Sequence, residues 1–119
     1  MALLQATYRD AGSITVLDLS GRITLGEGSA LLRSTIRELL EGNRFKILVN
    51  LGDINYIDSS GIGELVSAYT TVKNRGGELK LLNLTKKVHD LLQITKLYTV
   101  FDVHSDEVVA LRSFAIATA

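Results

Sequence analysis

The sequence predicts an α/β fold in which a mixed sheet of about five strands is covered by about four helices. Two short strand-like runs open the chain with only a turn between them, which predicts an N-terminal hairpin. Apolar strand-like and amphipathic helix-like segments then alternate to the end, which predicts βαβ units with parallel strands and right-handed crossovers. The 119 residues show no internal repeat or linker, so we expect one domain over residues 1–119.

The expected hairpin pairs Leu4–Tyr8 with Ile14–Leu19 across a turn-rich gap. Gly21 is expected to end the second strand. A glycine-punctuated loop at residues 22–28 follows, and Ser29 is a candidate N-cap. The helix after it carries apolar residues at spacings of three and four, namely Leu32, Ile36, Leu39 and Leu40.

The central strand is expected at Phe45–Leu51, a nearly continuous apolar run that suits burial on both faces. Glu78–Leu84 is expected to return as a parallel strand after an intervening helix, whose apolar stripe contains Ile62, Leu65, Val66, Tyr69 and Val72. Thr85 can cap a short helix, Val100–Val103 is a last short strand, and residues 105–114 form a terminal helix.

The junction between the central strand and the next helix carries Asp58, Ser59, Ser60, Gly61 and Gly63. A side-chain oxygen here can accept from unpaired backbone N–H groups, worth about 1 kcal/mol over alanine, so one interpretation is that Ser59 is a plain N-cap. The glycines each disfavour a helix by about 1 kcal/mol, which capping does not explain. We therefore expect a recognition surface that a backbone or a phosphate approaches closely. A phosphoryl group on a serine here would lie at the positive end of the helix dipole and add about two negative charges, enough to switch a partner off.

Composition and motif spacing argue against other functions. Thirteen basic residues balance thirteen acidic ones, so no nucleic-acid partner is expected. The sequence contains no cysteine. His89 and His104 share no metal-ligand spacing, so no metal is expected. Gly61 and Gly63 lack the third glycine of a dinucleotide fingerprint, and no glycine precedes the serines as in a nucleophile elbow, so neither an enzyme nor a cofactor is expected. Without a signal peptide or an apolar run of about 18 residues, we expect a cytoplasmic protein without membrane insertion.

Several linked features resemble the STAS domains of bacterial anti-sigma factor antagonists. They are the Asp58–Gly61 motif with Gly63, the helix end and strand start at residues 76–78, and a short helix followed by Leu97 and Phe101. The strand end at residues 19–23 and the helix at Leu32–Leu40 also fit, so the resemblance covers nearly the whole chain.

The resemblance implies a partner-switching adaptor rather than an enzyme. In the family, the unphosphorylated antagonist binds an anti-sigma factor that is also a serine kinase, and the sigma factor is released. Phosphorylation of the serine after the aspartate breaks this complex, and a serine phosphatase restores it. By position, Ser59 is the phosphoacceptor, Asp58 is its flanking acid, and the surrounding partner contacts are Ser60, Gly61, Ile62 and Gly63. The choice of Ser59 over Ser60 rests on family position alone.

One position departs from the family pattern. Family members commonly carry an acidic residue just after the strand end at Gly21, and this chain has Thr24 there. Glu27 in the same loop is a candidate substitute, so Thr24 and Glu27 are both counted among the expected partner contacts. The alternative function is an unmodified STAS module that serves as a subunit of a transporter or of a signalling assembly.

Overall fold

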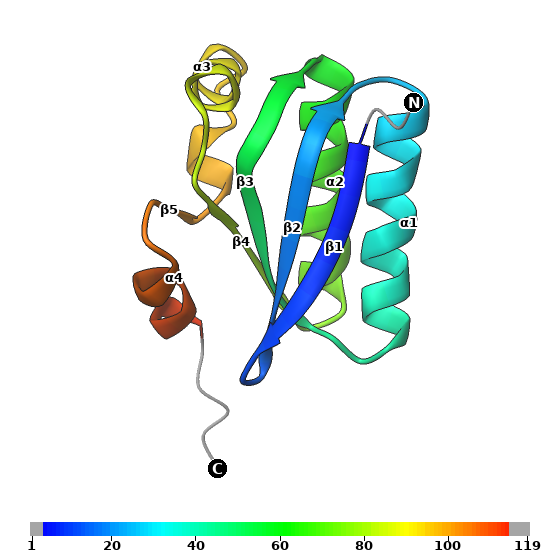
Figure 1. Cartoon of the computed structure of the whole chain (residues 1–119), viewed down its shortest axis with the longest axis vertical. Helices are drawn as coiled ribbons and strands as arrows, with labels where there is room; N and C mark the ends of the chain where they lie inside the picture. The colour runs from blue at the N-terminus through cyan, green and yellow to red at the C-terminus, as the bar shows by residue number, and fades with distance from the viewer. Residues whose placement is uncertain (1–3, 115–119) are drawn as a thin grey trace.

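The computed structural model describes residues 4–114 and confirms a mixed sheet with an N-terminal hairpin, accompanied by helices (Figure 1). The strands are β1 (Leu4–Ala11), β2 (Ile14–Ile23), β3 (Lys46–Ile57), β4 (Glu78–Leu82) and β5 (Val103–His104). The helices are α1 (Glu27–Glu41), α2 (Ser59–Asn74), α3 (Lys86–Ile94) and α4 (Glu107–Ser113), with a short 3-10 turn at Tyr98–Val100. The sheet order is β1-β2-β3-β4-β5, and only the β1–β2 pair is antiparallel within the described chain.

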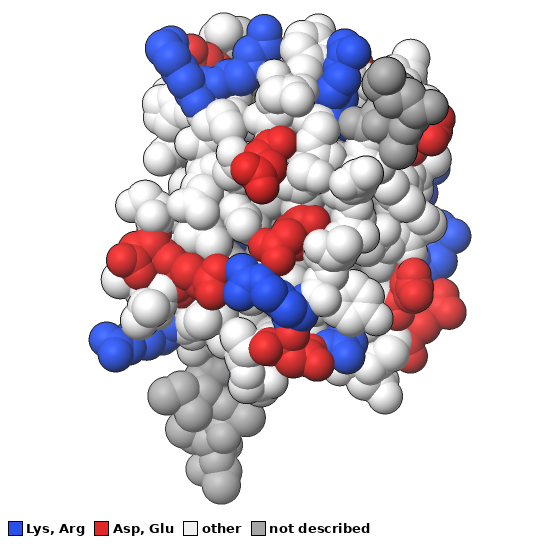
Figure 2. All heavy atoms as spheres, in the orientation of Figure 1, with Lys and Arg blue, Asp and Glu red and all other residues white. Residues whose placement is uncertain are grey.

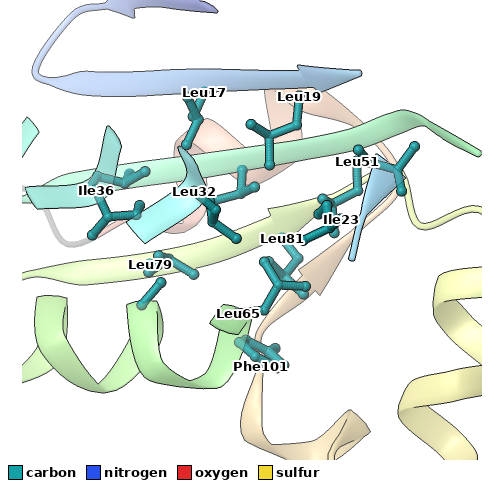
Figure 3. Packing of buried hydrophobic residues seen from close by; sticks show 14 of the residues in the cluster. Leu17, Leu19, Ile23, Leu32, Ile36, Leu51, Leu65, Leu79, Leu81 and Phe101 are labelled. Carbon is teal, nitrogen blue, oxygen red and sulfur yellow. The ribbon is translucent and has the colours of Figure 1, made fainter. Parts of the chain in front are cut away.

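The central strands are buried on both faces because their side chains alternate between two hydrophobic clusters. Leu17 and Leu19 of β2 belong to the cluster shared with α1 and α2, whereas Val16 belongs to a smaller cluster shared with α4. Figure 3 shows part of the larger cluster, where strand side chains meet those of the helices. Val88 and Leu92 of α3 join this cluster as well, so α3 and α2 are anchored to one core.

The two central strands run further than the sequence predicts. β2 continues through Gly21, whose φ is 103°, to Ile23, and β3 continues past Leu51 to Ile57. These extensions pair in parallel, with Gly21 opposite Ile54 and Ile23 opposite Ile57. Because both strands end at the same edge of the sheet, the loop after β2 lies beside the start of α2.

The start of α1 also differs from the prediction. α1 begins at Glu27, so Ser29 lies inside the first turn and is not the N-cap. Ser29 instead donates through Oγ and through its backbone N–H to the carbonyl oxygen of Thr24, at 2.9 and 3.0 Å. These two bonds fasten the loop between β2 and α1 to the helix that follows it.

Near the end of the described chain, the structure confirms one boundary and corrects another. Thr85 Oγ1 accepts from the Val88 N–H at 3.4 Å and caps α3, as predicted. The predicted last strand is present but shorter and later than Val100–Val103, because Tyr98–Val100 forms the 3-10 turn and only Val103–His104 pairs with β4. Across residues 4–114, no helix has both the length and the apolar character required to cross a membrane.

Candidate functional site

Ser59 is the first residue of α2 and follows the end of β3, at the carboxyl ends of the parallel strands. The residue that caps α2 is Asp58, whose Oδ1 accepts from the Gly61 N–H at 2.8 Å. Ser59 is exposed, and its hydroxyl makes no hydrogen bond to any residue in 4–114. The interpretation of Ser59 as a plain N-cap is therefore wrong, because the carboxylate beside it performs the capping.

Asp58 also ties the β2–α1 loop to the site. Its Oδ2 accepts from the backbone N–H of Leu25 at 3.1 Å, and its own N–H donates to the Ile23 carbonyl at 3.3 Å. Thr24 is half-buried at the root of this loop, and Glu27 is exposed at the start of α1. The structure thus brings the loop that contains Thr24, which leads into α1 at Glu27, up to the serine motif.

The two glycines of the motif differ in the space available for a side chain. A Cβ on Gly61 would lie 2.2 Å from the Ile23 carbonyl oxygen and 2.7 Å from Ile57 Cγ1, so α2 could not pack against the end of β2. A Cβ on Gly63 would have no described atom within 4 Å, and this residue is exposed. Gly61 and Ile62 lie beneath the surface, with Ile62 only 1% exposed, so these two residues support the site from the core.

A groove of about 430 Å³ separates the start of α2 from α3 beside Ser59. It is lined by Tyr56, Ile57, Asp58, Ser59, Lys87, Asp90, Leu91 and Ile94. Ile94 is 76% exposed and adds apolar surface to the α3 side of the groove. The site therefore extends from the motif on to α3.

Positive charge gathers around this groove. The Tyr56 ring has Arg22 Cζ and Lys87 Nζ each at 5.0 Å from its centroid. Figure 2 shows Lys and Arg side chains collected at the end of the molecule where β2 and β3 finish and α3 lies, whereas acidic side chains occupy the middle of that face. Lys86 donates to Asp90 Oδ2 at 2.6 Å, and this contact, with help from His89, lowers the pKa of the Asp90 carboxyl below its ordinary value.

Sequence reasoning missed Arg22, Lys87 and Ile94. The spacing of Val88 and Leu92 identifies the buried side of α3, but no local pattern links its outer side to a motif far earlier in the chain. One signal was present, because Lys86 and Lys87 form the first turn of α3, where the helix dipole disfavours cations. In residues 4–114, His, Asp and Glu side chains nowhere gather in a group of three that could hold a metal ion.

An exposed serine thus lies at the carboxyl ends of the parallel strands, in a five-stranded sheet with one antiparallel hairpin and three parallel pairings. A family model described as the STAS domain matches residues 5–110, and the chain belongs to this family. Two curated relatives indicate which members of the STAS family this chain is similar to. The chain is 24% identical to the anti-sigma F factor antagonist of Paenibacillus polymyxa over 116 residues, which cover 97% of this chain and 98% of the relative.

The second relative is the anti-sigma-B factor antagonist of Bacillus subtilis (strain 168), with 31% identity over 87 residues, 73% of this chain and 78% of the relative. Among solved structures, the phosphorylated form of the Bacillus cell fate determinant SpoIIAA superposes with a TM-score of 0.69. That match has 19% identity and covers 91% of this chain and 98% of the other, so it supports the fold alone. The resemblance to anti-sigma factor antagonists is confirmed.

Proposed function

We propose that this chain is a phosphorylation-controlled anti-sigma factor antagonist. In its unmodified form it binds an anti-sigma factor that is also a serine kinase and so frees a sigma factor in the cytoplasm. Phosphorylation of Ser59 ends this binding, and a serine phosphatase reverses the modification. The observation that carries the proposal is the exposed, unengaged hydroxyl of Ser59 at the start of α2, left free because Asp58 caps the helix.

The exposed neighbours of Ser59 form the proposed contact surface. Ser60 is half-buried beside it, Gly63 is exposed one turn further along α2, and Ile94 offers apolar area across the groove. Glu27 and the loop at Thr24 border the same site through the bond between Asp58 and Leu25. Gly61 and Ile62 contribute from beneath, by setting where α2 packs.

The modification is balanced as an ordinary phosphoryl transfer. The Ser59 Oγ–P bond forms as the bond between the γ-phosphorus and the bridging oxygen of ATP breaks, ADP leaves, and the hydroxyl proton passes to a base on the kinase. The product gains about two negative charges at a helix N-terminus, where the dipole favours an anion. The fold therefore tolerates the change, while a partner surface fitted to a neutral hydroxyl is repelled.

The test is a labelling assay with the cognate kinase and radioactive ATP. We expect incorporation into the wild type and into Ser60→Ala, and none into Ser59→Ala. Ser60→Ala is the matched control, since it removes an identical hydroxyl from the adjacent position. Equal labelling of the wild type and Ser59→Ala would contradict the proposal.

A binding measurement completes the test. Ser59→Asp places a negative charge at the proposed switch, and we expect it to weaken binding to the kinase at least tenfold, or by about 1.4 kcal/mol. The control is Ser67→Asp, an exposed serine on the same helix but two turns away. Undiminished affinity of Ser59→Asp, or an equal loss with Ser67→Asp, counts against a switch at Ser59.

A further inference from the structure

Arg22 and Lys87 converge on one aromatic ring. Arg22 of β2 is the register partner of Tyr56 in β3, and Lys87 reaches the same ring from α3. Neither cation makes an ion pair with a carboxylate in the described part of the chain. A cation held only by an exposed aromatic ring is weakly bound, and it is free to prefer an anion placed within its reach.

The groove connects Lys87 to Ser59, and Arg22 adjoins the groove through the ring of Tyr56. Tyr56, Ser59 and Lys87 all line it, together with two carboxylates, Asp58 and Asp90. Both carboxylates already have partners. Asp58 accepts from two backbone N–H groups, one on each oxygen, and Asp90 accepts from Lys86. The groove lining therefore holds two carboxylates that already have partners and one cation, Lys87, and a second cation, Arg22, lies beside the lining against Tyr56; neither cation has a carboxylate partner in residues 4–114.

We propose that Arg22 and Lys87 form an internal receptor for the phosphoryl group on Ser59. The proposal rests on the phosphorylation proposed above and deepens it by naming the groups that hold the phosphate. Once the serine is esterified, the two cations move from the Tyr56 ring to the phosphate oxygens, Lys87 on its flexible stem and Arg22 through its planar fork. The phosphate then links α2 to α3 and fills the groove beside Ile94. The partner can no longer dock in the groove, and it also meets a negative charge in place of the neutral Ser59 hydroxyl.

The test measures the acidity of the phosphate itself. Phosphoserine is placed at position 59 by genetic encoding, and the second pKa of its phosphate is followed by ³¹P NMR between pH 4 and 8 in 0.1 M salt. An unperturbed phosphoserine titrates near pH 6, and bound cations lower that pKa. We expect Lys87→Gln and Arg22→Gln each to raise the pKa by roughly 0.3, and the double variant by roughly 0.6.

The matched control is Lys73→Gln, which removes the same charge from the last turn of α2. Lys73 lies about 20 Å along the helix from Ser59, which is about two Debye lengths in 0.1 M salt. We expect this control to leave the pKa within about 0.1 of the wild type. All three side chains are exposed, so the variants retain the fold.

Two results would overturn the receptor. One is a double variant whose pKa stays within about 0.1 of the wild type, and the other is a control that shifts the pKa as much as Lys87→Gln does. Because the phosphoserine is encoded, neither result depends on a kinase. Failure of the receptor is thus distinguishable from failure of the switch, which the labelling of Ser59→Ala decides.

Discussion

Two exposed polar clusters of this molecule use their charges in opposite ways. On the sheet face that α4 partly covers, Arg9 of β1 donates two hydrogen bonds to Glu107 of α4, at 2.6 and 3.0 Å. Its Nε donates to Asp18 of β2 at 2.8 Å, and Asn50 of β3 donates to the same carboxylate at 2.9 Å. Beside Ser59, by contrast, Arg22 and Lys87 contact the Tyr56 ring and form no ion pair with a carboxylate among residues 4–114.

The difference separates a cluster that stabilises the fold from a region whose cations have no carboxylate partner in residues 4–114. In the Arg9 cluster each charge is compensated within the fold, and four elements are joined by it. The pKa of Glu107 is lowered by Arg9, and burial of Asp18 is outweighed by Arg9 and Asn50, so the pKa of Asp18 is lowered as well. Near the groove, Asp58 and Gly61 fix the position of the backbone. Among residues 4–114, the Ser59 hydroxyl has no hydrogen-bond partner, and Arg22 and Lys87 have no carboxylate partner.

The substitution with the largest expected effect on this comparison is Gly61→Ala. The added Cβ would meet the Ile23 carbonyl oxygen at 2.2 Å, so α2 must shift away from β2. We expect a loss of about 2–3 kcal/mol in the free energy of unfolding, measured by urea denaturation. Gly63→Ala is the control, because its Cβ enters open space on the same helix. Gly63→Ala should raise the free energy of unfolding by up to about 1 kcal/mol. Equal effects of the two substitutions would contradict the close packing of α2 against β2 that supports the site.

Asp58→Ala is expected to have the next largest effect. It removes the α2 cap and the acceptor of the Leu25 N–H, leaving two backbone donors unpaired. The expected destabilisation is about 1–2 kcal/mol, again from urea denaturation. Hydrogen exchange should show faster exchange at the amides of both Leu25 and Gly61. Asp58→Asn keeps one side-chain carbonyl oxygen and should retain part of this stability, and an unchanged Leu25 amide in Asp58→Ala would contradict the tie between loop and helix.

Ile94→Ser separates binding from stability. Ile94 is 76% exposed, so its replacement should change the free energy of unfolding by no more than about 0.5 kcal/mol. If the kinase docks in the groove, its affinity should fall about five- to tenfold, as calorimetry can measure. Val108→Ser on α4 is the matched control, an aliphatic residue 56% exposed outside the groove. A similar affinity loss for both would place the docking surface elsewhere.

The smallest expected effect is the pH response of the Arg9 cluster. The folded-state pKa values of Glu107 and Asp18 lie below their ordinary values of 4.5 and 3.8, so the stabilisation is present above those values and is lost as the pH falls through the folded ones. The Arg9 and Glu107 side chains are 46% and 37% exposed, which limits the effect to about 0.5 kcal/mol.

The measurement compares the wild type with Glu107→Gln in urea at pH 7 and at pH 3. The wild type should be the more stable at pH 7, and the difference should vanish at pH 3 or in 0.5 M salt, where the Debye length is only a few Å. A difference that persists at pH 3 would show that Glu107 stabilises α4 through contacts other than its charge.

The local pattern of the sequence determined most of the fold. Period-two and period-3.6 repeats of apolar residues identified the hairpin, the alternation of strands and helices, and the placement of Asp58–Gly63 between β3 and α2. These repeats are visible in one sequence because each arises from neighbouring residues that share one face of one element. The motif and its surroundings were likewise sufficient to identify the family.

Other properties were decided only by the tertiary structure. β2 and β3 extend beyond their apolar cores because each pairs with the other. Asp58 rather than Ser59 caps α2, a choice between two competent oxygens that depends on where the Gly61 and Leu25 N–H groups lie. The groove needs α3, which the shared core brings beside α2 from later in the chain. A sequence shows which side chains are available, but the distances between residues far apart in it are set by how the elements pack.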